Sequence, residues 1–331
     1  MASPVRLSAL VVGSGWARHA ATAFANREGE IEIVGVVGRG SARTEALARQ
    51  LATRAYTSLD EALAVRAPQL AVVAVDEASN VKVVQQLVMA GADVLCAHPV
   101  ARTAAEVRAL SELARERGRI ISTDYTLRTC AETITALEAV KSSGALLRVD
   151  IIYPGRLLPM ALDLALVFGG RAMAVCGFGT YPEETAEQRA RAPAAFPPTV
   201  VIEHMSGCVT TLCPCPHAET SRAFSVTASC AGARIELALP SGGARKVRLL
   251  KTGRTEVVVL RRAPRQEQEA VAVFGAAMRK LADDFVDAVL TRGVAPCSLE
   301  SEGAVRSAWA AIAHSMRSFG RVETVRTSAG W

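Results

Sequence analysis

Two glycines near the N-terminus have the spacing of a phosphate-binding turn. Gly13 and Gly15 follow a short apolar run, residues 5–12, and precede an alanine-rich stretch that predicts a helix. Glycine lets the backbone approach a pyrophosphate, whose charge the amides of a helix N-terminus stabilise. Because Arg18 replaces the usual third glycine, a tight turn without a ligand is the alternative. The candidate cofactor contacts in this turn are Gly13, Ser14, Gly15 and Trp16.

The end of the second predicted strand distinguishes between two nicotinamide cofactors. In folds with this turn, an Asp or Glu about 20 residues after the glycines binds the ribose of NAD. This window contains no carboxylate and instead holds Arg39, Ser41 and Arg43. Two guanidiniums and a hydroxyl suit a 2′-phosphate, because Arg forms charge-assisted pairs with phosphate oxygens. We therefore expect NADPH, with two solvated arginines at a helix start as the alternative.

Two acid–base side chains follow predicted parallel strands. His98 comes after residues 93–96 and Tyr125 after residues 119–122, at the edge where open α/β sheets bind ligands. A nicotinamide supplies a hydride, and Tyr or His can supply the proton that accompanies it in a reduction. We expect both residues to be catalytic. The alternatives are a core histidine bonded to backbone and a half-buried packing tyrosine.

Other polar residues are candidates for the same site. Asp76 and Asn80 follow the third predicted strand and are placed to line the nicotinamide ribose. Asp163 lies in an apolar helical segment, where an unpaired carboxylate is costly, so we expect a hydrogen-bond donor nearby. The candidate cofactor contacts beyond the glycine turn are Arg39, Ser41, Arg43, Asp76, Asn80, His98 and Pro99.

The elements that carry these residues change in character along the chain. Up to about residue 128 strands and helices alternate, which predicts right-handed βαβ crossovers and a doubly wound parallel sheet, a Rossmann fold. After about Thr129 strand-like segments follow one another through Gly-containing turns, which predicts an open, mainly antiparallel sheet. We expect a Rossmann domain at 1–128 that binds NADP and an α+β domain at 129–331 for substrate binding and oligomerisation.

The second predicted domain contains mostly strands. One helix is expected near 157–168, a loop or lid at 182–198, and two long helices at about 270–292 and 299–318, able to pack back on the first domain. The candidate strands are 147–153, 172–181, 200–205, 207–212, 223–230, 233–239, 246–251 and 255–260.

The composition excludes several classes of protein. Half of the 331 residues are hydrophobic and 21% are charged, which suits two packed domains rather than a disordered chain. The net charge of +6 is not gathered into Lys/Arg runs, so we expect no nucleic-acid partner. Without a membrane-length apolar run or a signal peptide, we expect a cytoplasmic protein with reduced cysteines.

Three residues of metal-ligating types lie close together near residue 215. Cys213-Pro-Cys215-Pro-His217 has the spacing of no common zinc motif, so we expect no metal and a proline-stiffened loop between strands.

Two longer segments resemble a known family. Residues 90–100, Ala-Gly-Ala-Asp-Val-Leu-Cys-Ala-His-Pro-Val, resemble the strand end "AG-x-H-V-L-C-E-K-P" of the glucose–fructose oxidoreductase/inositol dehydrogenase/MocA (Gfo/Idh/MocA) family. Leu281-x-x-Asp284-Phe285 and the residues from Gly293 to Gly303 resemble its terminal helix pair. The resemblance implies a dinucleotide-binding domain followed by a mixed domain with an open antiparallel sheet, and a homodimer.

Departures from the family pattern point to one branch. His98 stands where most members have a catalytic lysine, and Met160 stands where they have a histidine three residues before an aspartate, here Asp163. Met160 and Asp163 thus become candidate substrate contacts. The His-Pro pair, the Tyr in Thr123-Asp124-Tyr125 and Gly40-Ser-Ala-Arg43 resemble thiazolinyl imine reductases of siderophore biosynthesis.

This branch implies an activity and a partner. It implies an NADPH-dependent reductase that converts a thiazoline C=N bond to a thiazolidine on an intermediate bound to a carrier protein of a nonribosomal peptide synthetase. The positive net charge suits transient docking to an acidic carrier. The alternatives are an NAD(P)-dependent oxidoreductase of the same family that acts on a sugar or another carbonyl compound, and a non-catalytic regulatory protein that senses NADP.

Overall fold

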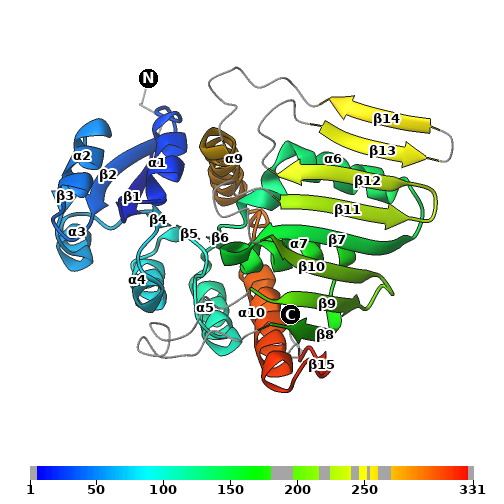
Figure 1. The fold of residues 1–331 in the computed structure, drawn as a ribbon. Coiled ribbons are helices and arrows are strands. Elements are labelled where there is room, and N and C mark those ends of the chain that lie inside the picture. Colours follow the sequence, from blue (N-terminus) through cyan, green and yellow to red (C-terminus); the bar gives the residue numbers. More distant parts are fainter. Residues whose placement is uncertain are drawn as a thin grey trace. The chain divides into compact units, whose positions relative to one another are not determined.

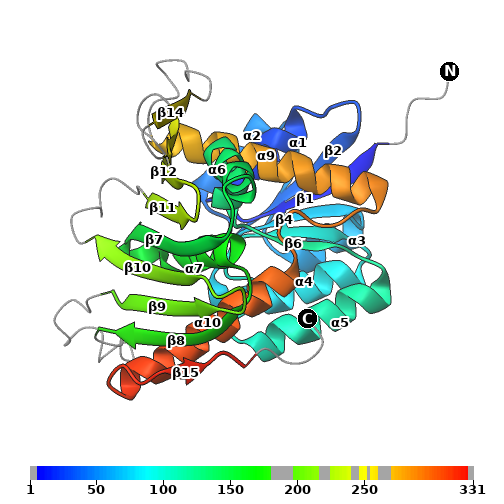
Figure 2. The same cartoon turned by 90° about the vertical axis from the view of Figure 1, so that its right-hand side faces the viewer.

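The chain divides into two units. The computed structural model describes residues 6–179, 197–215, 224–239, 246–251, 254–259 and 270–326 (Figures 1 and 2). The first unit comprises Met1–Thr126 and Gly275–Gly303, and the second comprises Leu127–Phe274 and Ala304–Trp331. The first unit is therefore built from two separate stretches of chain. No helix in the described ranges has the length and apolarity needed to cross a membrane.

The first unit contains the predicted doubly wound sheet. Its six strands have the order β3-β2-β1-β4-β5-β6, and every neighbouring pair is parallel, which confirms the Rossmann prediction. Its elements are β1 (Leu7–Val12), α1 (Ala17–Ala25), β2 (Ile31–Val37), α2 (Ala42–Gln50), β3 (Ala55–Tyr56), α3 (Leu59–Val65), β4 (Leu70–Val73), α4 (Glu77–Met89), β5 (Asp93–Cys96), α5 (Ala104–Arg117) and β6 (Ile121–Thr123).

Local sequence explains why these elements begin and end where they do. β4 and β5 are buried along their whole length, as apolar runs covered on both faces must be. The helices that follow β2, β4 and β5 are N-capped by the side chains of Ser41, Asp76 and Thr103. α5 ends at Gly118, whose left-handed φ of 60° is cheap only for glycine. The caps fix the strand-to-helix turns that line the ligand edge of the sheet.

The returning stretch is anchored to the Rossmann sheet by polar contacts. It includes most of α9 (Ala270–Thr291) and the start of α10 (Leu299–Arg317). Asp93, buried at the start of β5, accepts hydrogen bonds from the Ile120 backbone N–H (2.7 Å) and from Arg292 (3.2 Å). Thr123 donates its N–H to the Cys297 carbonyl at 2.8 Å, beside an antiparallel bridge between Ser122 and Ser298. The first turn of α10 is thereby held next to the end of β6.

The second unit contains a nine-stranded mixed sheet. Its order is β14-β13-β12-β11-β7-β10-β9-β8-β15, and all pairs are antiparallel except β7 with β10, which confirms the mainly antiparallel prediction. Helices α6 and α7 both pack on this sheet, and Figure 2 shows them on the same side of it. The remaining elements are α6 (Ala131–Lys141), β7 (Leu146–Pro154), α7 (Leu158–Gly169), β8 (Ala172–Phe178), β9 (Thr199–His204), β10 (Val209–Cys215), β11 (Phe224–Cys230), β12 (Arg234–Leu239), β13 (Lys246–Lys251), β14 (Arg254–Val259) and β15 (Glu323–Thr324), with short 3₁₀ turns at Thr126–Thr129 and Gly155–Leu157.

Two features of the second unit differ from the sequence prediction. The sequence pattern predicts no helix between residue 129 and the first strand, yet α6 forms there. Its buried residues Glu132, Thr133 and Ala136 are polar or small and make no apolar stripe. The predicted loop at Cys213–Cys215 is wrong, because these residues extend β10. Pro214 is tolerated since β9 pairs with β10 only up to Leu212, so no strand of the described chain needs a donor from Pro214 on that side.

Candidate active site

The glycine turn between β1 and α1 has the features of an anion cradle. Gly13 has φ +100°, and a Cβ there would lie 2.1 Å from the Ala74 carbonyl oxygen, so only glycine fits. At Gly15 a Cβ would meet no heavy atom of the described chain within 4 Å. Trp16 occupies the N-cap of α1 without a side-chain cap, and the first turn holds no acidic residue. The amides at this helix start are therefore available to a phosphate, which fits a dinucleotide.

The arginines expected to bind a 2′-phosphate follow β2 on the surface. Arg39 and Arg43 are exposed, and Ser41 caps α2 by accepting the Thr44 N–H at 3.3 Å. Asp76 caps α4 and accepts both the N–H and the hydroxyl of Ser79. The hydrogen bond from Ser79 is the main reason why the pKa of Asp76 lies below its ordinary value, with a small contribution from the charge of Arg39.

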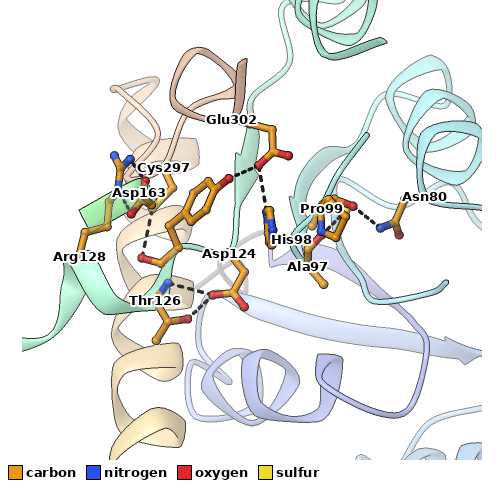
Figure 3. Close-up of polar contacts among 12 residues, drawn as sticks. Asn80, Ala97, His98, Pro99, Asp124, Thr126, Arg128, Asp163, Cys297 and Glu302 are labelled. Atoms are coloured by element: carbon orange, nitrogen blue, oxygen red, sulfur yellow. Dashed lines mark hydrogen bonds and ion pairs between the residues drawn. The ribbon is translucent and has the colours of Figure 1, made fainter. Parts of the chain in front are cut away.

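Asn80 presents a buried acceptor near the end of β5. Its amide donates to the Pro99 carbonyl at 2.6 Å, which ties the start of α4 to the segment after β5 (Figure 3). Its side-chain oxygen is buried and has no hydrogen-bond partner in the described chain. A buried amide oxygen without a partner is costly, and a ribose hydroxyl is a donor of the right kind. This orphaned acceptor also fits a bound dinucleotide.

His98 and Tyr125 meet at one carboxylate that the sequence analysis did not anticipate. Tyr125 donates its hydroxyl to Glu302 Oε2 at 2.6 Å, and His98 Nδ1 lies 3.2 Å from the same oxygen (Figure 3). The two rings are tilted by 40° with centroids 5.0 Å apart. Both residues lie two positions after the ends of β5 and β6, as predicted, while Glu302 comes from the first turn of α10. All three belong to the first unit.

A second buried carboxylate accompanies this cluster. Burial is the main cause that raises the pKa of Asp124 to about 6, against lowering by hydrogen bonds from Thr126 and by the charge of His98. The Trp16 indole also lowers this pKa, although it makes no hydrogen bond of standard geometry. Cys96, at the end of β5, has its pKa raised by burial and by the charges of Glu302 and Asp124. The site thus combines one imidazole, one phenol and two carboxylates.

The predicted substrate residues lie in the second unit. Asp163 is buried in α7 and has the donor that its apolar setting required: Arg128 Nε donates to Oδ2 at 3.0 Å, and a second guanidinium nitrogen contacts Oδ1. Met160 is half-buried one turn earlier in the same helix. Most of the predicted lid, residues 182–196, lies outside the described residues, as does His217 of the cysteine group. Among the described residues no group of His, Cys, Asp and Glu could hold a metal ion.

Comparison with known proteins supports the class defined by this fold and site. Residues 7–125 match the model of the GFO_IDH_MocA oxidoreductase family, with its NAD-binding Rossmann fold. The match covers the Rossmann strands of the first unit, and this similarity supports an oxidoreductase that binds a nicotinamide cofactor. No curated protein matches the chain significantly.

Solved structures extend the similarity to the whole fold. Levoglucosan dehydrogenase in complex with NADH and levoglucosan has 14% identity and a TM-score of 0.81, covering 98% of this chain and 100% of the other. UDP-N-acetylglucosamine 3-dehydrogenase from Acidithiobacillus ferrooxidans has 19% identity and a TM-score of 0.76, covering 96% and 99%. An oxidoreductase from Agrobacterium radiobacter in complex with NAD+, L-tartaric acid and magnesium has 14% identity and a TM-score of 0.77, covering 97% and 99%. At these identities the likeness concerns the fold.

Proposed function

We propose that the protein is an NADPH-dependent reductase of a carbon–nitrogen double bond, and specifically of a thiazoline bound to a carrier protein. The observation that carries the proposal is the convergence of His98, Tyr125 and Glu302 after the strand ends of a sheet whose glycine turn fits a dinucleotide. A bound dihydronicotinamide supplies the hydride for such a reduction. The chain's own residues must then orient the substrate and deliver a proton to its nitrogen.

The charge of the cluster favours nitrogen over oxygen as the atom that is protonated. Glu302 is fully buried, and Asp124, with its pKa near 6, is mostly ionised at neutral pH. Asp124 therefore adds a negative charge close to His98. A protonated C=N group is cationic and is stabilised by such neighbours, whereas carbonyl reduction builds negative charge on oxygen and is opposed by them. The negative charge beside the site therefore supports an imine as the substrate.

The phosphorylated cofactor is proposed from the segment after β2. Arg39 and Arg43 are exposed beside the α2 N-terminus, where a 2′-phosphate would gain charge-assisted hydrogen bonds. We expect NADPH to bind at least about tenfold more tightly than NADH, since one such pair is worth about 1.5–3 kcal/mol. The double variant Arg39→Ala with Arg43→Ala should lose this preference while keeping its affinity for NADH. A fluorescence titration with both cofactors measures this.

A second candidate has support of its own. The similar structures include enzymes named for oxidation of levoglucosan and of a UDP-sugar, and a His–carboxylate pair can also accept a proton from a hydroxyl. The deciding experiment incubates the protein with NADPH and 2-substituted thiazolines, and in parallel with NADP⁺ or NAD⁺ and a set of sugars and polyols. Thiazolidine formation supports the proposal. Turnover of polyols alone supports the dehydrogenase, and tight NADPH binding without any turnover supports a regulatory protein.

A further inference from the structure

Three basic side chains gather where helices α1 and α9 of the first unit lie side by side (Figure 1). Arg18 and His19 belong to the first turn of α1, directly after the glycine turn, and Arg279 belongs to α9. Arg18 is exposed, and the other two are half-buried. Burial first, and then the charges of both arginines, lower the pKa of His19, so the three groups lie within electrostatic reach of one another. We call them the basic cluster.

The charge of the basic cluster is not balanced by acidic side chains. The nearby acids of α9 pair with other cations, Asp284 with Lys280 and Asp287 with Arg27. No ion pair in the described part of the chain involves either arginine of the cluster. The first turn of α1 holds no acidic residue, and basic side chains are unfavourable there because the helix dipole already makes that end positive. Such an arrangement is stabilised by a bound anion.

Two hydrogen-bond donors of the cluster face one open space beside Gly275. Arg18 Nε donates to His19 Nε2 at 3.5 Å, so Nδ1 is the ring nitrogen that carries the hydrogen in neutral His19. A Cβ built on Gly275 would lie 3.6 Å from His19 Nδ1 and 3.5 Å from Arg279 Nη1, with no other non-neighbouring heavy atom of the described chain within 4 Å. The glycine thus leaves room for an oxygen atom that accepts from both nitrogens.

The basic cluster lies at the ligand edge of the Rossmann sheet. Met278, next to Arg279, contacts the Thr126 hydroxyl through its sulfur at 3.6 Å, just beyond the end of β6. The proposed cofactor has phosphate contacts of its own: the glycine turn for the pyrophosphate, and Arg39 and Arg43 for the 2′-phosphate. A further anion at this edge therefore belongs to the other reactant.

We propose that Arg18, His19 and Arg279 bind a phosphate group carried by the substrate. In the proposed function this group is the phosphodiester of the phosphopantetheine arm that joins the thiazoline to its carrier protein, so the source of the phosphate rests on that function. No covalent bond changes at this site. The guanidiniums and the imidazole hold the anion through charge-assisted hydrogen bonds, which retain the far end of the substrate during the reduction.

Calorimetric titration of inorganic phosphate into the NADPH-saturated protein, at constant ionic strength, tests the site without turnover. The wild type should bind phosphate, and Arg279→Gln should weaken this binding by about tenfold or more. Gly275→Ala keeps every charge but fills the space beside His19 Nδ1, and should weaken binding too. Two matched controls should bind as the wild type does: Arg115→Gln, at an exposed arginine of α5, and Gly29→Ala, whose methyl group would meet no heavy atom of the described chain within 4 Å.

Steady-state kinetics tests the source of the phosphate. The wild type should have a KM about tenfold lower for a thiazoline on 4′-phosphopantetheine than for the same thiazoline on pantetheine, and Arg279→Gln should abolish this difference. Equal KM values in the wild type would overturn the inference, as would phosphate binding that neither Arg279→Gln nor Gly275→Ala weakens. A tenfold loss of NADPH affinity in Arg279→Gln would also overturn it, because the site would then serve the cofactor. If the wild type reduces neither thiazoline, the proposed function fails, and the calorimetric titration still decides whether the basic cluster binds phosphate.

Discussion

Asp124 should destabilise the folded protein at neutral pH, and its replacement by Asn should reveal how much. Burial raises the pKa of this carboxyl from 3.8 to about 6. The folded state therefore holds the proton more tightly than the unfolded state, and stability falls as pH rises from about 4 to about 6, then stays low. This pKa difference of about two units lowers the free energy of unfolding by about 3 kcal/mol above pH 6.

Asn can replace Asp here without losing the local hydrogen bonds. Asp124 Oδ1 accepts the Thr126 N–H at 3.0 Å and also the Thr126 hydroxyl, and an amide oxygen accepts both equally well. Asp124→Asn should therefore raise the free energy of unfolding of the first unit by about 3 kcal/mol near pH 8 and by about half of that near pH 5. We expect it to lose activity, because its charge faces His98.

Urea unfolding followed by tryptophan fluorescence measures this difference, since Trp16 lies close to Asp124. At each pH the free energy of unfolding of the variant is compared with that of the wild type, so that the contributions of other titrating groups cancel. Asp60→Asn, which removes an exposed carboxylate from α3, serves as the control and should change stability by less than about 1 kcal/mol at either pH. Stability curves for Asp124→Asn and the wild type that run parallel from pH 5 to 8 would refute the reasoning.

Two further predictions concern stability. Asp93→Ala should cost about 1–4 kcal/mol in urea unfolding, because it leaves the half-buried Ile120 N–H without its acceptor. Arg292→Ala removes only a half-exposed ion pair and should cost less than about 1 kcal/mol, so equal losses would contradict this ranking. His204 is buried between the Gly170 carbonyl and the Thr210 hydroxyl, and burial lowers its pKa below 6.5. Since the unfolded state then binds the proton more tightly, the wild type should lose thermal stability as pH falls below about 6.5, and His204→Gln should show a shallower loss in calorimetry.

The sequence allowed the Rossmann unit to be predicted because its signals are local. Apolar runs such as those of β4 and β5 alternate with helices that begin at strong caps, and such a pattern permits few topologies. In the second unit most strands were found from their alternation and glycine turns. Helix α6 was missed because its buried face includes Glu132 and Thr133, so its period carries no hydrophobic signal.

The site was only half predictable for a related reason. His98 and Tyr125 follow strand ends, and the rule that ligands bind at this edge needs no distant information. Glu302 lies 177 residues after Tyr125, and an acid in the first turn of a helix is ordinarily a solvated partner of the helix dipole. One local signal was present: Glu302 is three residues from Leu299 and from Val305, on the face of α10 that becomes buried. An acidic residue on the same helix face as an apolar stripe indicates a carboxylate that is buried and paired.

The late position of Glu302 in the sequence determines which fragments of the chain can contain the whole acid–base site. The groups that would hold the dinucleotide and the two strand-end side chains all lie before residue 127, so a fragment ending there would contain every predicted catalytic residue. It would lack the carboxylate that both side chains contact, and Asp93 and Thr123 would lose the partners they have at Arg292 and Cys297. A buried tyrosine hydroxyl that loses this acceptor costs about 1–3 kcal/mol. The acid–base site is thus completed only by chain that follows strands β7 to β14 of the second unit.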